Sequence, residues 1–317
     1  MTPRVAVVTG ASAGVGRATA RRLGAKGWAL GLVARGPDGL EAAAREVEQA
    51  GGRALVLTAD VADPDAVENV AGRAEDSLGP IDVWINDAMA TIFAPLDEIT
   101  PDEYRRSTEV TYLGAVWGTM AALRRMKPRD RGTIVQVGSA LAHRGIPLQA
   151  PYCGAKHAIQ GFTESLRAEL DHDGSRVRVT MVQLPAHNTP QFSWGRTRMP
   201  RHPQPVPPIF QPEVAADAIV HAVFHPKHEY YVGWPTVKTV FGNRIAAGLV
   251  DRYLARKAYD AQQTDDLVDP GRPDNLFEPV GGDHGTHGVF DGRARDTSWL
   301  WTLTKARSLA VARLLGR

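Results

Sequence analysis

Two side chains able to do acid–base chemistry lie four positions apart in the stretch YCGAK, residues 152–156. Tyr152 is a weak acid with an ordinary pKa near 10, whereas Lys156 carries a positive charge. Positions four apart share one face of a helix, so the ammonium group can favour the phenolate form of the tyrosine. The spacing therefore indicates a tyrosine tuned for proton transfer, although helices also carry such pairs without catalytic use.

A serine precedes this pair at the end of an apolar run. Ser139 closes the stretch GTIVQVGS, residues 132–139, which has the composition of a buried strand. A hydroxyl group at a strand end can hydrogen-bond a substrate oxygen and hold it near a phenol. We therefore expect Ser139 to orient the substrate oxygen for proton exchange with Tyr152.

A glycine-rich turn, TGASAGVG at residues 9–16, follows the first apolar run directly and opens a helical stretch. Glycines permit a tight turn and a close backbone approach to a pyrophosphate, and the helix N-terminus supplies free N–H groups. The other interpretation is a turn that merely connects two elements. The residues expected to contact a dinucleotide here are Gly10, Ser12, Ala13, Gly14, Val15 and Gly16.

The second apolar run ends in Arg35, where an NAD site usually has an acidic residue for the ribose 2′-hydroxyl. A guanidinium group can instead pair bidentately with a 2′-phosphate, so the sequence favours NADP over NAD. A solvent-exposed arginine at a strand end is the alternative. Asp60, followed by Val61, is expected to hydrogen-bond the adenine amino group, unless it is only a turn residue.

Short apolar runs alternate with helical stretches through the first two thirds of the chain. The predicted strands are 4–10, 28–35, 53–61, 81–88, 132–139, 176–184 and 229–234, and the predicted helices are 13–27, 39–51, 64–79, 101–127, 152–171 and 213–224. This alternation predicts an α/β fold, a doubly wound parallel sheet of Rossmann type, with helices on both faces. We assign this single domain to residues 1–240, followed by a C-terminal extension, 241–317.

Residues 190–212 are rich in proline and predict a long ordered loop or lid. Its large apolar side chains either cover a greasy substrate or pack on their own domain; they are Phe192, Trp194, Met199 and Phe210. In the extension, residues 243–263 read as a helix and 269–296 as an irregular or flexible segment. Within that segment, His284 and His287 lie near Asp283, which makes a metal site conceivable. Because nothing nearby completes a set of ligands, we expect a solvated loop instead.

The last segment is basic, with apolar residues three or four apart: Trp299, Leu303, Ala306, Ala310 and Leu314. We expect this stripe to pack against protein, such as a neighbouring subunit. A peripheral membrane helix and a disordered segment are the alternatives.

Bulk properties exclude several classes of function. The net charge of +2 is too small for nucleic acid to be the main partner. No run of about 18 apolar residues exists, and the N-terminus lacks the pattern of a signal peptide. The single cysteine, Cys153, cannot form an internal disulfide, which indicates a reducing compartment and hence the cytoplasm. We expect Cys153 to be a small buried residue.

Taken together, TGASAGVG, DV at 60–61, GS at 138–139 and YCGAK resemble the short-chain dehydrogenase/reductase family over residues 4–235. The resemblance implies that Tyr152 is the general acid/base, that Lys156 supports it and binds the nicotinamide ribose, and that Ser139 orients the substrate. It also implies a homodimer or homotetramer. Further cofactor contacts are implied at Asn86, Ala88, Pro185 and Thr189.

The chain departs from the family pattern at three places. NDAM, residues 86–89, stands for NNAG, so Asp87 and Met89 replace an asparagine and a glycine; Met89 either reshapes the pocket or fills space. Thr111 replaces an asparagine whose backbone carbonyl serves a proton relay. The pair PG is missing in QLPAHNTP, residues 183–190, where His187 would lie close to the nicotinamide as a plain loop histidine.

The predicted function is NADP(H)-dependent interconversion of a carbonyl and an alcohol, with a small and possibly apolar substrate. Two alternatives stay open. The same scaffold supports dehydration or isomerisation. The altered motifs would also suit a cofactor-binding sensor or regulatory protein that has lost turnover.

Overall fold

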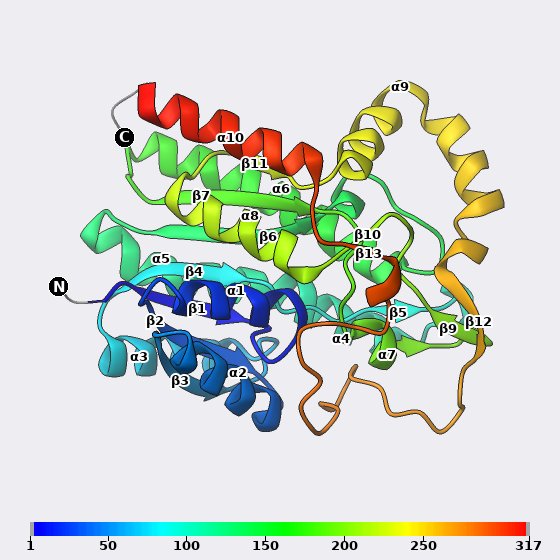
Figure 1. Cartoon of the computed structure of the whole chain (residues 1–317), viewed down its shortest axis with the longest axis horizontal. Helices are drawn as coiled ribbons and strands as arrows, with labels where there is room; N and C mark the ends of the chain where they lie inside the picture. The colour runs from blue at the N-terminus through cyan, green and yellow to red at the C-terminus, as the bar shows by residue number, and fades with distance from the viewer. Residues whose placement is uncertain (1–2, 315–317) are drawn as a thin grey trace.

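A seven-stranded parallel sheet forms the centre of the protein in a computed structural model that describes residues 3–314 (Figure 1). The spatial order is β11-β7-β6-β4-β1-β2-β3. The strands are β1 (Val5–Thr9), β2 (Ala29–Ala34), β3 (Arg53–Thr58), β4 (Ile81–Asn86), β6 (Thr133–Ser139), β7 (Arg178–Leu184) and β11 (Glu229–Tyr231). The chain order reverses between β1 and β4, and such a reversal opens a crevice at the carboxyl ends of the strands.

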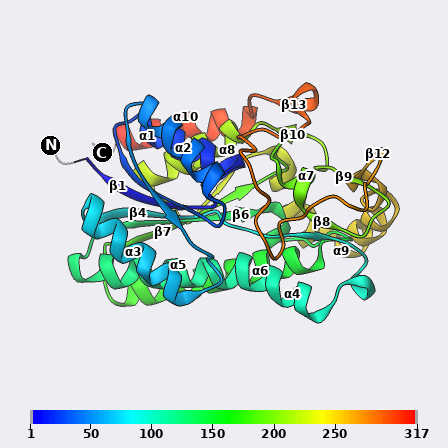
Figure 2. The same ribbon diagram turned by 90° about the horizontal axis from the view of Figure 1, so that it is seen from below.

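Helices cover both faces of the sheet (Figure 2). One face carries α1 (Gly14–Gly24), α2 (Pro37–Gln49) and α8 (Pro212–Phe224), and the other carries α3 (Pro64–Leu78), α5 (Gly114–Met126) and α6 (Ala150–His172). Side chains of β1 alternate between the two cores, with Ala6 and Val8 in one and Val5 and Val7 in the other. This double burial explains the apolar strands, and the predicted doubly wound α/β fold is confirmed.

The helical stretch predicted over residues 101–127 contains a π turn. It consists of α4 (Pro101–Thr108), the π turn η2 (Glu109–Leu113) and α5. Thr111 lies in this turn and exchanges two hydrogen bonds of 3.0 Å with the backbone of Ala90 through its hydroxyl group. The side chain that replaces the family asparagine therefore ties the helix to the segment after β4.

The proline-rich segment before α8 is held by short strand pairs rather than by a long element. It contains α7 (Gln191–Trp194), β8 (Arg196–Thr197), β9 (Arg201–Pro203) and β10 (Ile209–Phe210). β8 pairs with β5 (Ile92–Phe93), β9 pairs with β12 (Gln263–Leu267), and β10 pairs with β13 (Ala294–Arg295). Two of these partners belong to the C-terminal extension, so the extension and this segment order one another.

The extension begins with a helix that is longer at its start than predicted. α9 spans Trp234–Lys257, because Gly233 adopts the extended conformation of an N-cap and Pro235 suits the first turn. The short 3-10 turns η1 (Leu96–Glu98), η3 (Lys127–Arg129), η4 (Ala140–Ala142), η5 (Asp260–Gln262) and η6 (Asp291–Arg293) complete the elements before the last helix. The division at residue 240 falls inside α9 and stays a prediction.

Within this chain, the final helix, α10 (Trp299–Leu314), leaves Trp299, Leu303, Ala306 and Ala310 exposed, while the Leu314 side chain lies outside what the structure describes. The expected packing of this stripe on a neighbouring subunit stays a prediction. Trp301 is its buried anchor, with 4% of its surface exposed, whereas Trp299 and Leu303 are 58% and 61% exposed. The Trp301 ring nitrogen donates to Asp217 of α8 at 2.7 Å, and Lys305 pairs with the same carboxylate at 2.8 Å. Among residues 3–314, no helix combines the length and apolarity needed to cross a bilayer.

Candidate functional site

A cavity of about 980 Å³ lies at the carboxyl ends of the strands. Its walls come from the glycine turn after β1, the ends of β2, β3, β4, β6 and β7, the start of α6, the proline-rich segment, α9 and the extension. The two ends of the predicted site, the glycine turn and the Tyr152 region, therefore open into one space.

Ser139, Tyr152 and Lys156 come together on one wall of this cavity. Ser139 ends β6, and the other two side chains lie one turn apart on α6. The hydroxyl groups of Ser139 and Tyr152 are hydrogen-bonded to each other. The Lys156 ammonium lies 5.6 Å from the centre of the Tyr152 ring and donates to the carbonyl of Val137 at 2.6 Å.

The protonation of Tyr152 differs from the expectation. Burial raises the pKa of the phenol above its usual value, and the hydrogen bond with Ser139 offsets only part of this rise. The lowering expected from Lys156 is not found; the charges of Cys153 and Asp87 raise the pKa of Tyr152 further, and a buried phenolate loses its hydration. The neutral phenol is therefore the stable form in the protein alone, which suits a proton donor.

Asp87 is a functional candidate that the sequence indicated only as a departure from the family pattern. Its carboxylate lines the cavity, accepts the backbone N–H of Gly16 and faces Lys156. Burial raises the pKa of Asp87, and the Lys156 charge and the Gly16 N–H oppose that rise. Burial also lowers the pKa of Lys156, which Asp87 opposes in turn. The two charges therefore sustain each other in the crevice.

The glycine turn forms a close-fitting cradle. Gly10 and Gly14 adopt left-handed conformations with φ values of 71° and 56°. A Cβ atom at Gly16 would lie 2.3 Å from the carbonyl oxygen of Gly10, so only glycine fits there. Ser12, Ala13 and Val15 line the cavity beside this turn. A backbone this open at a helix N-terminus fits a dinucleotide pyrophosphate.

Arg35 and Asp60 line the cavity, but both already have partners. The Arg35 guanidinium donates to the carbonyl of Phe277 at 2.6 Å, to that of Leu276 at 3.4 Å and to that of Asn275. Asp60 pairs with Arg106 and accepts the backbone N–H of Ala62 at 3.0 Å. Sequence spacing could not show that the extension reaches Arg35. Val61 lines the same wall.

Some of the remaining residues predicted to contact the cofactor line the cavity, and one supports the cavity wall from behind. Ala88, Pro185 and Thr189 line the cavity, as does Met89. Asn86 is buried, and its amide group donates to Ala115, Thr119 and Gln136 at 3.0 to 3.2 Å. Asn86 thus braces β4 from behind the wall.

His187 is a buried member of the wall after β7. Its Nδ1 atom lies 2.9 Å from the carbonyl oxygen of Pro185. Burial lowers the pKa of His187 to about 4, so its ring is neutral near pH 7.

Apolar side chains of the proline-rich segment divide between the cavity wall and packing on their own domain, and their role in covering a substrate stays a prediction. Phe192 and Phe210 line the cavity and are buried, Trp194 lines it while half-buried, and Met199 packs in a separate apolar cluster with Phe93. Cys153 is buried, as predicted. The cavity therefore has an apolar part of its lining in addition to the polar groups of α6.

The two histidines of the extension lie in an irregular segment, where His287 is exposed and His284 is half-buried, and both have partners. His287 bridges Glu213 and Asp291 at 3.0 and 2.9 Å, and the ring of His284 meets the edge of Trp194 at 4.5 Å. Across residues 3–314, no cluster of His, Cys, Asp or Glu is arranged to hold a metal ion.

Comparison with known proteins places this site among dehydrogenases. Residues 4–197 match the family described as short chain dehydrogenase. The uncharacterized oxidoreductase YxnA of Bacillus subtilis is 30% identical over 317 residues, which cover 99% of this chain and 88% of that protein. The 3-dehydrosphinganine reductase of Danio rerio is 32% identical over 222 residues, 68% of this chain and 66% of that protein.

Two solved structures share the fold and about a quarter of the aligned residues. An alcohol dehydrogenase of the archaeon Thermococcus sibiricus, complexed with 5-hydroxy-NADP, superposes with a TM-score of 0.62 and 28% identity. A metagenomic short-chain oxidoreductase in complex with NADP gives a TM-score of 0.60 and 27% identity. Both cover 72% of this chain, and 95% and 94% of their own lengths.

Proposed function

Because the chain belongs to the short-chain dehydrogenase family, we propose that it is an NADP(H)-dependent oxidoreductase that interconverts a carbonyl and an alcohol. The observation that carries this proposal is the meeting of Ser139, Tyr152 and Lys156 on a cavity that also holds the glycine cradle. The NADP complexes of the two similar structures, together with Arg35 at the end of β2, support NADP(H) as the cofactor.

Each polar group then has a distinct task. When bound, the nicotinamide supplies or accepts the hydride. In the reductive direction, Ser139 hydrogen-bonds the carbonyl oxygen, and the Tyr152 hydroxyl gives its proton to that oxygen as negative charge develops there. The resulting phenolate is stabilised by the ammonium of Lys156, which Asp87 keeps charged. Because its pKa is raised, Tyr152 carries its proton near neutral pH before the reaction, as a donor in the reductive direction must.

The substrate is a small carbonyl compound or alcohol with an apolar body. Phe192, Trp194 and Phe210 form the wall that would bury that body, and one relative is named as a 3-dehydrosphinganine reductase. We expect the protein to act in the cytoplasm as a homodimer or homotetramer. Light scattering of the purified protein measures that mass directly.

The test uses two tyrosine variants of one kind. Tyr152→Phe should lower kcat/KM for a carbonyl panel about 10³-fold without changing the Kd of NADPH, because only the proton donor is lost. Tyr259→Phe, on a tyrosine that does not line the cavity, is the matched control and should retain activity.

Two results would overturn the proposal. Binding of neither NADPH nor NADH to the wild type, measured by fluorescence titration, would exclude a dinucleotide site. Tight NADPH binding without turnover on the whole panel would favour the sensor interpretation instead.

A further inference from the structure

An irregular segment of the extension, residues 274–285 (orange in Figure 1), contributes to the lining of the cavity and reaches the glycine turn at Gly14. We call these residues the strap. Its members that line the cavity are Asn275, Pro279, Val280, Gly282 and His284. The family match ends at residue 197, so the strap lies outside the part of the chain that defines the family.

The first anchor of the strap lies over the ends of β2 and β3. Backbone carbonyls of residues 275–277 accept three hydrogen bonds from the guanidinium of Arg35. Arg106 donates to the carbonyl of Leu276 at 3.1 Å and also pairs with Asp60. The Leu276 side chain is 0% exposed and joins the core cluster that contains Val61. An apolar plug therefore fixes the strap beside the groups predicted to hold the adenosine.

The second anchor lies on the glycine turn itself. The backbone N–H of Gly14 donates to the carbonyl of Gly285 at 3.2 Å. Asp283 pairs with Arg17, a nearly buried arginine of α1 that also pairs with Glu46 at 2.8 Å. These contacts hold the strap across the cradle that fits a pyrophosphate.

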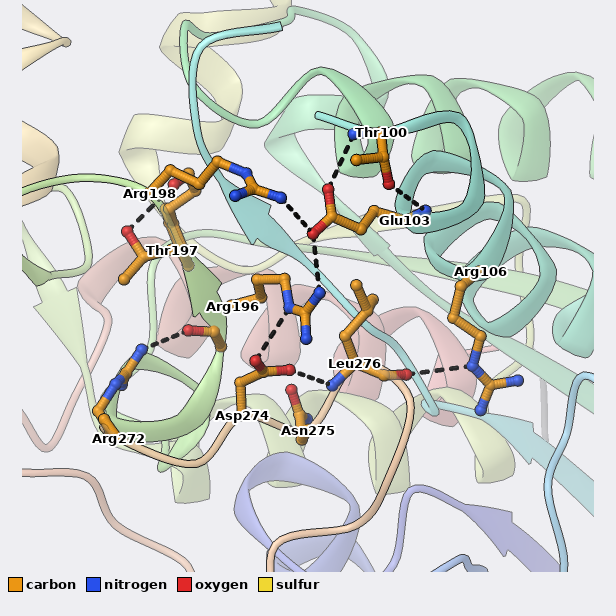
Figure 3. A network of polar contacts seen from close by, with 12 residues as sticks. Thr100, Glu103, Arg106, Arg196, Thr197, Arg198, Arg272, Asp274, Asn275 and Leu276 are labelled. Atoms are coloured by element: carbon orange, nitrogen blue, oxygen red, sulfur yellow. Dashed lines mark hydrogen bonds and ion pairs between the residues drawn. The ribbon is translucent and has the colours of Figure 1, made fainter. Parts of the chain in front are cut away.

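The third anchor joins the strap to the proline-rich segment (Figure 3). Asp274 pairs with Arg196 at 2.9 Å, and the backbone N–H of Asn275 donates to the carbonyl of Trp194 at 3.1 Å. Just before the strap, Arg272 donates to the carbonyl of Gly195 at 2.5 Å. The strap is thus held at both ends and is tied to the wall that faces the substrate.

Resting on NADP(H) as the ligand, we propose that the strap is part of the cofactor site: it forms the outer wall over the adenosine phosphates and sets both cofactor exchange and NADP preference. A guanidinium has five N–H donors, and three strap carbonyls engage three of them. The carbonyls thereby fix the plane of Arg35 and leave two donors for a 2′-phosphate. NADP(H) leaves only when the Leu276 plug and the Asp283 ion pair separate from the domain.

Two strap variants and one control test this proposal in the full chain. Leu276→Ala removes the plug, and Asp283→Ala removes the anchor on Arg17; Asp296→Ala makes the same change at an exposed aspartate beyond the strap. Stopped-flow displacement of NADPH, followed by its fluorescence, should show release about tenfold faster in both strap variants, because a weaker wall opens more often. Release from Asp296→Ala should stay within about twofold of the wild type.

Cofactor preference gives a second readout. The ratio of NADH to NADPH dissociation constants should fall in Leu276→Ala, because the carbonyls that orient Arg35 are displaced with the plug. Circular dichroism checks that each variant is folded.

Hydrogen exchange of the wild type tests the strap even if a variant fails to fold. Peptides spanning 274–285 should exchange more slowly when NADPH saturates the protein.

The outcomes separate the strap from the proposed function. Failure of the wild type to bind NADPH would remove the proposed function and the strap's role with it. NADPH binding to the wild type with unchanged strap exchange, and with release from both folded variants at the wild-type rate, would overturn the strap proposal alone.

Discussion

At the scale of single residues, the charged states of Asp87 and Lys156 depend on each other. Burial disfavours both charges, and each charge counteracts that effect on its partner. An asparagine at position 87 would leave the ammonium without its counter-charge. Replacing one carboxylate oxygen of Asp87 by an amide nitrogen would therefore change the charge that Lys156 presents to Tyr152.

We predict that Asp87→Asn shifts the alkaline limb of the kcat/KM profile to lower pH by about one unit. In the proposed mechanism Lys156 acts in its charged form, and losing Asp87 lets burial lower the pKa of Lys156 further. Activity should consequently disappear at a lower pH than in the wild type, while NADPH affinity at pH 6.5 is retained.

Rate measurements between about pH 6 and 10 test this shift. Asp76→Asn, on an exposed face of α3, provides the control and should reproduce the wild-type profile. Superimposed profiles for Asp87→Asn and the wild type would show that Asp87 does not act on Lys156.

The placement of the site residues was predictable where it depends on local structure, while their catalytic roles stay predictions. Tyr152 and Lys156 share a helix face, and Ser139 ends a strand, so their meeting follows from spacing and topology. The partners of Arg35 lie 240 to 242 residues further along the chain. No local pattern encodes such a contact, because three backbone carbonyls can come from any sequence.

At the scale of elements, the start of α4 does more than begin a helix. Glu103 forms a capping box with Thr100 and also pairs with Arg196 and Arg198 at 2.7 and 2.6 Å (Figure 3). Only 3% of its side chain is exposed. The cap of α4 therefore holds the proline-rich segment in place, and through Arg196 it also reaches the strap.

We predict that Glu103→Gln lowers the free energy of unfolding at pH 7 by about 2 kcal/mol, because charge-assisted hydrogen bonds are lost. Burial alone would raise the pKa of Glu103, but Arg198, the Thr100 amide and Arg196 lower it to about 2. The stabilisation is complete above the unfolded-state pKa of about 4.5 and disappears as the pH falls toward 2.

Urea denaturation at pH 7 and at pH 3 tests both parts of this prediction. The difference between wild type and Glu103→Gln should shrink at the lower pH. Glu98→Gln, an exposed change nearby, should alter stability by less than about 0.5 kcal/mol. An equal deficit at both pH values would mean that the carboxylate charge is not responsible.

Element prediction was sound for the sheet and weak for the extension. Apolar runs of strand length alternate with helical stretches, and burial on both faces requires that pattern. The composition of residues 269–296 predicted an irregular or flexible segment. The segment is irregular, but Leu276 and Asp283 anchor it to the domain through tertiary contacts that composition does not reveal.

At the scale of the whole molecule, α10 fastens the end of the described chain to α8. Trp301 packs edge-on against Tyr230 at 5.6 Å, and its ring nitrogen bonds Asp217. Its neighbour Trp299 lies at the cavity rim, largely exposed. The apolar spacing of the sequence identified a stripe on the helix but not the face that packs on this domain.

We predict that Trp301→Ala lowers the free energy of unfolding by about 3 kcal/mol, through a cavity and the loss of one of the hydrogen bonds to Asp217, which keeps its pairs with Lys305 and Arg22. Trp299→Ala is the matched control and should change stability by about 0.5 kcal/mol or less. Thermal melts monitored by circular dichroism compare the two. Equal losses would mean that both faces of α10 are buried, as an assembly of several copies would require.

The strap has a consequence for how the protein is made. The glycine cradle lies within the first 16 residues, whereas the ion pair that closes it joins positions 266 residues apart. A nascent chain emerges N-terminus first, so the parallel sheet can form on the ribosome well before the outer wall exists. Early folding intermediates would thus exchange nucleotide freely, and the finished protein would be the first species able to retain it. Synthesis itself would then order the events, with cofactor capture as the last step of maturation.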